Sequence, residues 1–400
     1  MKRIYFDYAA SSPMALEVKK TIALTQEKFG NPGSLHFFGQ EAMKIVDESR
    51  EKIAQAINAD FREIIFTGSA TEANNLALSG VIKAAKKYLG RNKARIIISS
   101  VEHESVLATA RNLEKDGIGV IYLPVDKNGF VDLQKLKKSL NRNTILVSVM
   151  YANNETGSIQ PIKEITKIIS EFKKNLNKPI NQSTNYPIVH VDAVQAFQYL
   201  DCDVKDLGVD LMTLSGHKIC GPKGIGALYI KNQQLTTNNL QPIILGGGQE
   251  FGLRSGTENT ALIAGFAKSI ELTDKNRKLE IKRMSNIKSY FWKKIKSIFP
   301  KAQLNGIISD KFLPNIFSVY FPNFNGYDLL IKLDLVGVAV STGAACSARS
   351  SEPSYVLKAC GLSEKRIKSS LRFSFGRYTT KQEIDEAVKR IKLVLSSSLV

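Results

Sequence analysis

The 400-residue sequence has few cysteines and no long apolar run. No stretch approaches the roughly 20 apolar residues that a membrane-spanning helix needs, and the N-terminus lacks the apolar core of a secretion signal. Its four cysteines form no CxxC pair and no Cys/His cluster with metal-ligand spacing. This argues against a disulfide framework and a metal site. We therefore expect no membrane partner, no bound metal and a cytoplasmic location, where thiols stay reduced.

Acidic residues are scarce relative to basic ones, with 37 Asp and Glu against 56 Lys and Arg and a formal net charge of +19. Such a charge can indicate nucleic acid or an acidic partner. The lysines, however, are spread along helical stretches such as residues 82–93 and 275–296, without the interleaved aromatic residues of single-strand binders. We interpret them as solvated helix faces and expect no direct nucleic-acid binding; a weak anionic protein or RNA partner is the alternative.

Short β-branched runs alternate with amphipathic stretches through the first part of the chain. Strands are predicted at residues 63–66, 94–99, 120–123, 144–150, 188–191, 211–214 and 225–230, and helices at 71–89, 105–115, 133–140 and 162–172. This alternation predicts an α/β fold with a mostly parallel sheet and helices on both faces. Ligands of such sheets bind at the carboxyl ends of the strands.

The pattern changes after Gly256. A long helix is predicted at residues 259–299, followed by strands at 315–320, 338–341 and 371–375 and a helix from Lys381. We expect three parts: residues 1–20 packing with the small domain, a large cofactor-binding domain at 21–258, and a smaller α+β domain at 259–400. The polar, Asn-rich stretch 175–186 is interpreted as a surface loop.

Lys218 follows an apolar strand and lies in the glycine-rich stretch SGHKICGPKG, residues 215–224. A lysine that forms a Schiff base needs a fixed, partly desolvated position, so that its amine can be neutral and nucleophilic. Ser215 and His217 beside it can donate hydrogen bonds to a phosphate. Taken alone, a lysine in a glycine-rich turn is more often an exposed loop residue.

Three further motifs stand where strands end. Asp192 ends a strand, where it could pair with a pyridinium nitrogen or simply cap a helix. The stretch TGSATE, residues 67–72, joins a strand to a helix N-terminus that could bind phosphate, although ordinary capping would give the same pattern. His103 follows residues 94–99; it could stack on a flat cofactor and move protons, or be an ordinary surface histidine.

Together these motifs resemble the fold-type I pyridoxal-phosphate (PLP) enzymes of the aminotransferase class V group, and within it the NifS/IscS-like cysteine desulfurases. The resemblance continues in order through YFDYAA (5–10), GNPGS (30–34), NNETG (153–157), GGGQE (246–250), RSGT (254–257) and SLRFSFGR (370–377). It covers nearly the whole chain and implies the PLP-dependent transferase fold type I.

The resemblance also implies the roles of the site residues. Lys218 would hold PLP covalently and move the substrate α-proton, while Asn154 and Arg372 would bind the substrate carboxylate. The remaining cofactor contacts would be His103 on the ring face, Asp192 at the pyridine nitrogen, Gln195 at the phenolic oxygen, and Ala70, Thr71, Ser215 and His217 at the phosphate. Thr257 would reach the phosphate of the neighbouring subunit in a homodimer.

Cys346 lies among small residues in the stretch STGAACSARSS, residues 341–351, with Arg349 nearby to favour its thiolate. The resemblance places the nucleophile there, so that L-cysteine becomes L-alanine and Cys346 carries the sulfur as a persulfide. An iron–sulfur scaffold or a tRNA thiolation enzyme would accept it. Alternatives are a selenocysteine lyase, another class V aminotransferase, and a non-catalytic sulfur-relay or RNA-binding scaffold. Cys202 and Cys360 are interpreted as structural, and Cys220 as a tolerated substitution.

Overall fold

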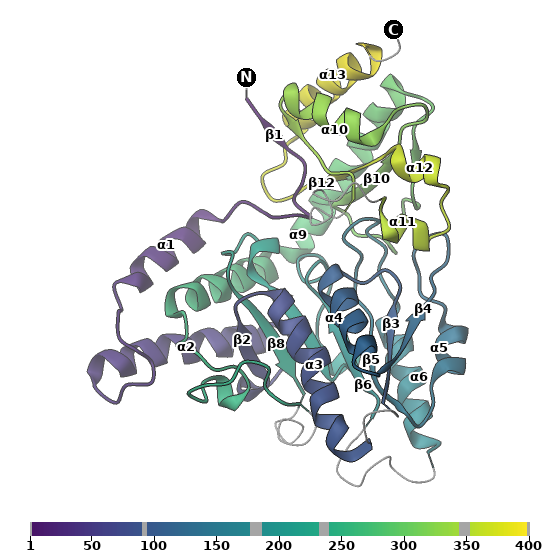
Figure 1. Cartoon of the computed structure of the whole chain (residues 1–400). Coiled ribbons are helices and arrows are strands. Elements are labelled where there is room, and N and C mark those ends of the chain that lie inside the picture. Colours follow the sequence, from purple (N-terminus) through teal and green to yellow (C-terminus); the bar gives the residue numbers. More distant parts are fainter. Residues whose placement is uncertain (1, 90–93, 177–185, 232–239, 344–352, 398–400) are drawn as a thin grey trace.

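The computed structural model describes residues 2–89, 94–176, 186–231, 240–343 and 353–397 (Figure 1). A large sheet with its helices forms the lower part of the molecule in that view, and a smaller group of strands and helices lies above it. The long helix α9 (Thr260–Ile298) connects the two parts. None of the helices in these ranges is both long and apolar enough to cross a membrane.

The large sheet contains seven strands in the order β2-β8-β7-β6-β5-β3-β4. They are β2 (Ile64–Thr67), β3 (Arg95–Ser99), β4 (Gly119–Leu123), β5 (Thr144–Ser148), β6 (Ile188–Asp192), β7 (Leu211–Ser215) and β8 (Gly226–Ile230). The neighbours from β7 to β4 pair in parallel, whereas β8 runs antiparallel to both β2 and β7. The predicted mostly parallel sheet is therefore confirmed, with each predicted strand shifted by two residues or fewer at its ends.

Helices cover both faces of this sheet because its central strands bury side chains on both sides. In β3, Ile96 and Ile98 join the hydrophobic cluster beneath α3 (Ala70–Leu89) and α4 (Glu104–Lys115). Ile97, between them, points into the cluster on the opposite face. That cluster also contains apolar residues of α2 (Phe37–Ala56), α6 (Ile162–Lys174) and α9. The short helices α5 (Leu133–Ser139) and α7 (Val204–Leu207) complete this part.

The smaller part is built on a three-stranded antiparallel sheet in the order β12-β10-β9. Its elements are β9 (Gln303–Leu304), β10 (Ile316–Tyr320), α10 (Gly326–Leu335), β11 (Val338–Ala339), α11 (Tyr355–Ala359), α12 (Glu364–Lys368), β12 (Ser370–Ser374) and α13 (Lys381–Ser397). Phe291 of α9 contacts the rings of Phe6, Phe373 and Phe375, which ties the long helix to this sheet. The α+β character predicted for this region is confirmed.

The N-terminal segment joins both parts. Strand β1 (Ile4–Tyr5) pairs in parallel with β11 of the small part. Further along, the N–H groups of Ser12 and Ala15 donate to carbonyls of His217 and Cys220 in the large part. The helix α1 (Leu16–Gln26) then packs along α9. Neither α1 nor α2 is among the predicted elements, and the division at residues 20 and 258 stays a prediction.

Candidate active site

A pocket of about 190 Å³ lies at the carboxyl ends of the parallel strands. It is lined by Ala9, Ala10, Ser69, Ala70, Thr71, Asn74, His103, Met150, Asn154, Asp192, Val194, Gln195, His217, Lys218 and Arg372. Nine residues singled out in the sequence are among them: Ala70, Thr71, His103, Asn154, Asp192, Gln195, His217, Lys218 and Arg372. The fold thus brings together side chains more than 300 positions apart in the chain.

Lys218 ends a tight turn, η2 (Gly216–Lys218), directly after β7. The turn depends on glycine, because a Cβ at Gly216 would come within 2.8 Å of the Pro222 carbonyl oxygen. The Lys218 amine donates to the carbonyl oxygens of Ala9 at 2.6 Å and Ala10 at 2.8 Å. Lys218 therefore belongs to the pocket and is not an exposed loop residue.

His217 lies beside that amine. Burial lowers the pKa of His217 to about 4, with smaller contributions from the positive charges of Lys218 and Lys223 and from His103. Near neutral pH the His217 imidazole is therefore uncharged, so it can donate a hydrogen bond to an anion without adding a second positive charge next to Lys218.

Asp192 ends β6 and is almost completely buried. Its Oδ2 accepts a hydrogen bond from Asn74 Nδ2 at 2.8 Å, and its Oδ1 accepts from the Val194 N–H at 3.0 Å. His103 caps the N-terminus of α4, with its Nδ1 accepting from the Ser105 N–H at 3.1 Å. The carboxylate and the imidazole are thus both held in fixed orientations at the pocket.

The N-terminus of α3 supplies the end of the pocket suited to a phosphate. The first-turn N–H groups of a helix have no partner within the helix and are aligned with its positive dipole end. Glu72 orders the preceding loop: its Oε2 accepts from the Gly68 N–H at 2.9 Å and its Oε1 accepts from Arg254 Nε at 2.8 Å. Arg254 connects this loop to the segment that carries Thr257. Ser215 is buried and Thr257 is exposed, and neither lines the pocket.

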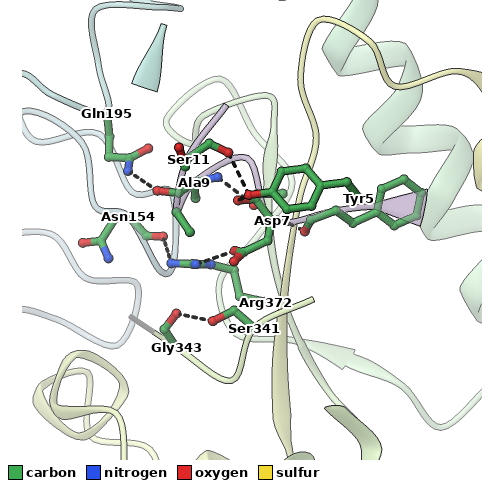
Figure 2. Close-up of polar contacts among 12 residues, drawn as sticks. Tyr5, Asp7, Ala9, Ser11, Asn154, Gln195, Ser341, Gly343 and Arg372 are labelled. Carbon is green, nitrogen blue, oxygen red and sulfur yellow. Dashed lines mark hydrogen bonds and ion pairs between the residues drawn. The ribbon is translucent and has the colours of Figure 1, made fainter. Parts of the chain in front are cut away.

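Arg372 of β12 reaches the pocket from the small part (Figure 2). Its guanidinium donates to the Asn154 carbonyl oxygen at 2.9 Å and to Asp7 Oδ1 at 2.7 Å. Although Arg372 is only 2% exposed, its Nε has no hydrogen-bond partner among the described residues, and the same holds for Oδ1 of the buried Asn154. A ligand carboxylate would accept a hydrogen bond from Arg372 Nε, and a ligand N–H would donate one to Asn154 Oδ1.

The N-terminal segment forms one wall of the pocket, which the sequence analysis missed. Gln195 Nε2 donates to the Ala9 carbonyl oxygen at 2.9 Å, and Asp7 pairs with Arg372 (Figure 2). Asn74 was also missed. The motif YFDYAA could have indicated the N-terminal wall. Asn74 could have been found from its position one helical turn after Ala70, on the same face of α3.

Cys346 and Arg349 lie outside the described residues. The segment that leads to them begins beside Arg372, because Ser341 and Arg372 exchange two backbone hydrogen bonds. The other cysteines, Cys202, Cys220 and Cys360, are buried free thiols.

Burial raises the pKa of Cys202 and of Cys360 to about 12, and it also raises the pKa of Cys220. These three thiols are therefore poor nucleophiles. Within the described ranges no His, Cys, Asp and Glu side chains cluster as a metal site.

Comparison with known proteins agrees with this geometry. The family model of aminotransferase class-V matches residues 4–387. A protein of Dictyoglomus turgidum named cysteine desulfurase IscS is 43% identical over 397 residues, covering 99% of this chain and 95% of that protein. A Bacillus subtilis protein named putative cysteine desulfurase IscS 1 is 42% identical over 393 residues, 98% of each chain.

Solved structures of NifS-like and related proteins are also similar to this chain over most of its length. A NifS-like protein superposes with a TM-score of 0.88 at 34% identity, covering 99% of this chain and all of that one. A structure described as SspA in complex with cysteine has a TM-score of 0.79 at 35% identity, covering 94% of this chain and 99% of that one.

The chain belongs to the aminotransferase class-V family, whose members are PLP-dependent enzymes of fold type I. Within this family it belongs with the cysteine desulfurases of the IscS and NifS type. The pocket fits the cofactor, since it combines a lysine amine, a buried carboxylate, an imidazole and a helix N-terminus. The alternatives of an aminotransferase, a selenocysteine lyase or a non-catalytic scaffold receive no support from these relatives.

Proposed function

We propose that the pocket around Lys218 is the desulfurase active site and that Cys346 receives the sulfur. The observation that carries the assignment is the convergence of Lys218, Asp192 and Arg372 on one pocket of about 190 Å³. In this assignment, PLP would be held by Lys218, by Asp192, His103 and Gln195 around its ring, and by Ala70, Thr71 and His217 at its phosphate. Ser215, the residue before the turn that carries His217, would join the phosphate site although it is not among the residues that line the pocket. When bound, PLP supplies an electron sink for the carbanion that forms at the substrate α-carbon.

The carboxylate of L-cysteine would bind Arg372 and Asn154. Arg372 supports this role because its Nε is buried without a partner among the described residues, while Asp7 and the Asn154 carbonyl oxygen fix the rest of the guanidinium. With the substrate anchored in this way, the Lys218 amine, which lines the same pocket, would remove its α-proton.

The sulfur step would use the Cys346 thiolate. As the thiolate attacks the substrate sulfur, the bond from that sulfur to the substrate β-carbon breaks and a sulfur–sulfur bond forms on Cys346. The β-carbon takes a proton and leaves as L-alanine, so the substrate carbon is reduced while the Cys346 sulfur is oxidised to a persulfide. A sulfur-acceptor protein, either an iron–sulfur scaffold or a tRNA thiolation enzyme, would then collect the sulfur.

Purified protein supplied with PLP and L-cysteine tests this proposal, with alanine and sulfide followed in parallel under reductant. We expect the wild type to release both, Lys218→Ala to release neither, and Cys346→Ala to lose sulfide and persulfide formation. Mass spectrometry without reductant should find one extra sulfur on the peptide that contains Cys346. Cys360→Ala is the matched control, because this buried cysteine is outside the pocket. Full activity of Cys346→Ala would overturn the assigned sulfur route.

The proposal includes a homodimer in which Thr257 reaches the partner's phosphate site. Thr257 is exposed and absent from the pocket of its own chain, as a contribution to a second subunit requires. An apolar patch of Phe29, Leu35, Phe37 and Phe38 is also exposed, and a surface of this kind is typical of a protein interface.

We further propose a cytoplasmic location. The described cysteines are free thiols, which is expected in a reducing compartment.

A further inference from the structure

Asn74 connects two groups of the pocket that are distant in the sequence. It lies on α3, is completely buried and lines the pocket. Its Nδ2 donates one hydrogen bond to Asp192 Oδ2 and one to Ser105 Oγ, both at 2.8 Å. Both hydrogens of the amide are therefore used, one by a carboxylate at the end of β6 and one by a hydroxyl on α4.

The direction of each bond in this network follows from the donors that are available. Both oxygens of Asp192 accept hydrogen bonds, from Asn74 and from the Val194 N–H, so the Asn74 side chain must turn its NH₂ group toward the carboxylate. Ser105 Oγ then accepts from Asn74. Its own hydrogen is left for His103 Nδ1, 2.8 Å away.

The ring of His103 consequently has a defined tautomer. Its Nδ1 receives the Ser105 hydroxyl and also the Ser105 backbone N–H, at 3.1 Å. A nitrogen that accepts two hydrogen bonds carries no hydrogen of its own, so the N–H of the neutral ring is at Nε2.

We propose that Asn74 is a positioning residue that works through Ser105, fixing the carboxylate of Asp192 and the Nε2–H tautomer of His103 together. This inference rests on the assignment of Asp192 and His103 to the cofactor site. Asn74 Oδ1 supports it: this atom is buried and has no hydrogen-bond partner among the described residues. A buried amide that only filled space between helices would be expected to pair its oxygen as well, whereas here the two donors alone are used.

The relay has consequences for cofactor binding and for the hydrogen bonds that the pocket offers. A carboxylate held by two donors cannot rotate away from a pyridinium nitrogen. Less conformational entropy is therefore lost when the cofactor binds. The His103 ring offers the pocket a hydrogen-bond donor at Nε2. Removal of the Asn74 amide releases one oxygen of Asp192 and leaves Ser105 Oγ free to turn from His103.

Nuclear magnetic resonance of histidine ring nitrogens in the apoprotein tests the relay without catalysis. The chain has four histidines, so a His103→Gln sample assigns the signals of His103. The wild type should show a hydrogen on Nε2 and an unprotonated Nδ1. Asn74→Ala should shift the Nδ1 resonance or mix the tautomers, and Ser105→Ala should do the same with Asn74 in place. A hydrogen on Nδ1 in the wild type would overturn the proposal.

Cofactor affinity provides the second readout. Loss of one hydrogen bond to a charged group should weaken PLP binding to Asn74→Ala by about tenfold, measured by titration of the apoprotein. Asn75→Ala is the matched control: Asn75 is the next residue of α3, its Nδ2 donates to the Thr71 carbonyl oxygen, and it does not line the pocket. Its resonances and affinity should equal those of the wild type. Thermal unfolding confirms that each variant is folded.

Failure of the relay and failure of the proposed function give different results. If Asn74→Ala leaves both the His103 resonances and PLP affinity unchanged while the wild type produces alanine and sulfide, the relay is wrong and the desulfurase site stands. If the wild type shows the expected tautomer and Asn74→Ala changes it, but no variant or wild-type sample releases alanine, the relay stands and the active-site assignment falls.

Discussion

At the scale of single residues, the pocket is surrounded by buried polar groups whose protonation depends on the fold. Glu102, next to His103 in the chain, is completely buried. Its Oε1 accepts hydrogen bonds from Ser99 Oγ at 2.7 Å and from the Met150 N–H at 2.6 Å, and Met150 lines the pocket. Burial outweighs these two bonds and raises the pKa of Glu102 from 4.5 to about 8, with a smaller contribution from Asp192 in the same direction.

This shift predicts a pH-dependent loss of stability. Above about pH 4.5 the unfolded chain releases the Glu102 proton, whereas the folded chain keeps it up to about pH 8. Ionisation therefore favours the unfolded state across this window, and the free energy of unfolding falls as the pH rises. Glu102→Gln keeps an acceptor and cannot ionise, so between pH 5 and 8 it should gain roughly 1–3 kcal/mol relative to the wild type.

Urea unfolding at pH 5, 6.5 and 8 measures this difference. Glu104→Gln is the control, because Glu104 is a partly exposed glutamate two positions away. This partly exposed substitution should not give the gain in unfolding free energy expected for Glu102→Gln. Parallel pH profiles for Glu102→Gln and the wild type would show that the Glu102 carboxyl is not held protonated by the fold.

At the scale of elements, a buried ion pair fastens the loop before Thr257 to the large sheet. The guanidinium of Arg50, on α2, donates to both oxygens of Glu250, at 2.7 and 2.8 Å. Glu250 Oε2 also accepts from the Phe66 N–H of β2 at 2.8 Å. Glu250 and Phe251 have φ values of +50° and +57°, a strained conformation that the ion pair holds in place.

Breaking this pair should destabilise the protein strongly. Arg50→Met leaves the Glu250 carboxylate buried and unpaired, which typically costs about 3–5 kcal/mol of unfolding free energy. The double variant Arg50→Met with Glu250→Gln removes both charges and should recover most of the loss. Lys52→Met, an exposed position on α2, is the control for urea unfolding. A double variant no more stable than Arg50→Met would contradict the assignment of the cost to the unpaired charge.

At the scale of the whole molecule, two distant parts of the chain meet at the pocket. A second feature at this scale is an exposed apolar surface beside α1 and α2. Asp7 and Arg372, from the two ends of the sequence, meet at 2.7 Å above the large sheet. The apolar patch lies on the segment between α1 and α2 and at the start of α2; Leu35 is 92% exposed and Phe37 is 69% exposed. The rings of Phe29 and Phe38 already pack together, with their centroids 5.1 Å apart.

Mass measurement in solution tests whether this patch lies in the dimer interface. We expect a particle of twice the 44.3 kDa chain mass for the wild type. Phe37→Asp should shift the equilibrium toward monomer and weaken PLP binding severalfold, because Thr257 would be removed from the partner's site. Leu393→Asp, at an exposed leucine on α13, should leave mass and affinity unchanged. A dimeric Phe37→Asp variant with normal PLP affinity would exclude the patch from the interface.

Local sequence patterns were sufficient to locate the strands of the large sheet and to predict its mostly parallel character, but not its strand order or the antiparallel direction of β8. Its strands are short, predominantly apolar runs, most of them rich in β-branched residues, as burial on both faces of a parallel sheet favours. The positions of Lys218, Asp192 and His103 were also predictable, since each directly follows or ends a strand and ligands of parallel sheets bind at the carboxyl ends. Their chemical roles came from the family motifs.

Other features depended on contacts that no local pattern contains. The helix α1 buries only Val18 and Thr25 among its residues, so its packing on α9 decides its structure more than its own periodicity does. The orientations of Asp192 and His103 depend on Asn74 and Ser105, which lie on two different helices. The Arg372 guanidinium is held by Asp7, 365 positions earlier in the chain. The sequence determined which chemical groups the site contains, and the tertiary structure decided how they are aimed, because hydrogen-bond geometry between distant segments exists only once the chain has folded.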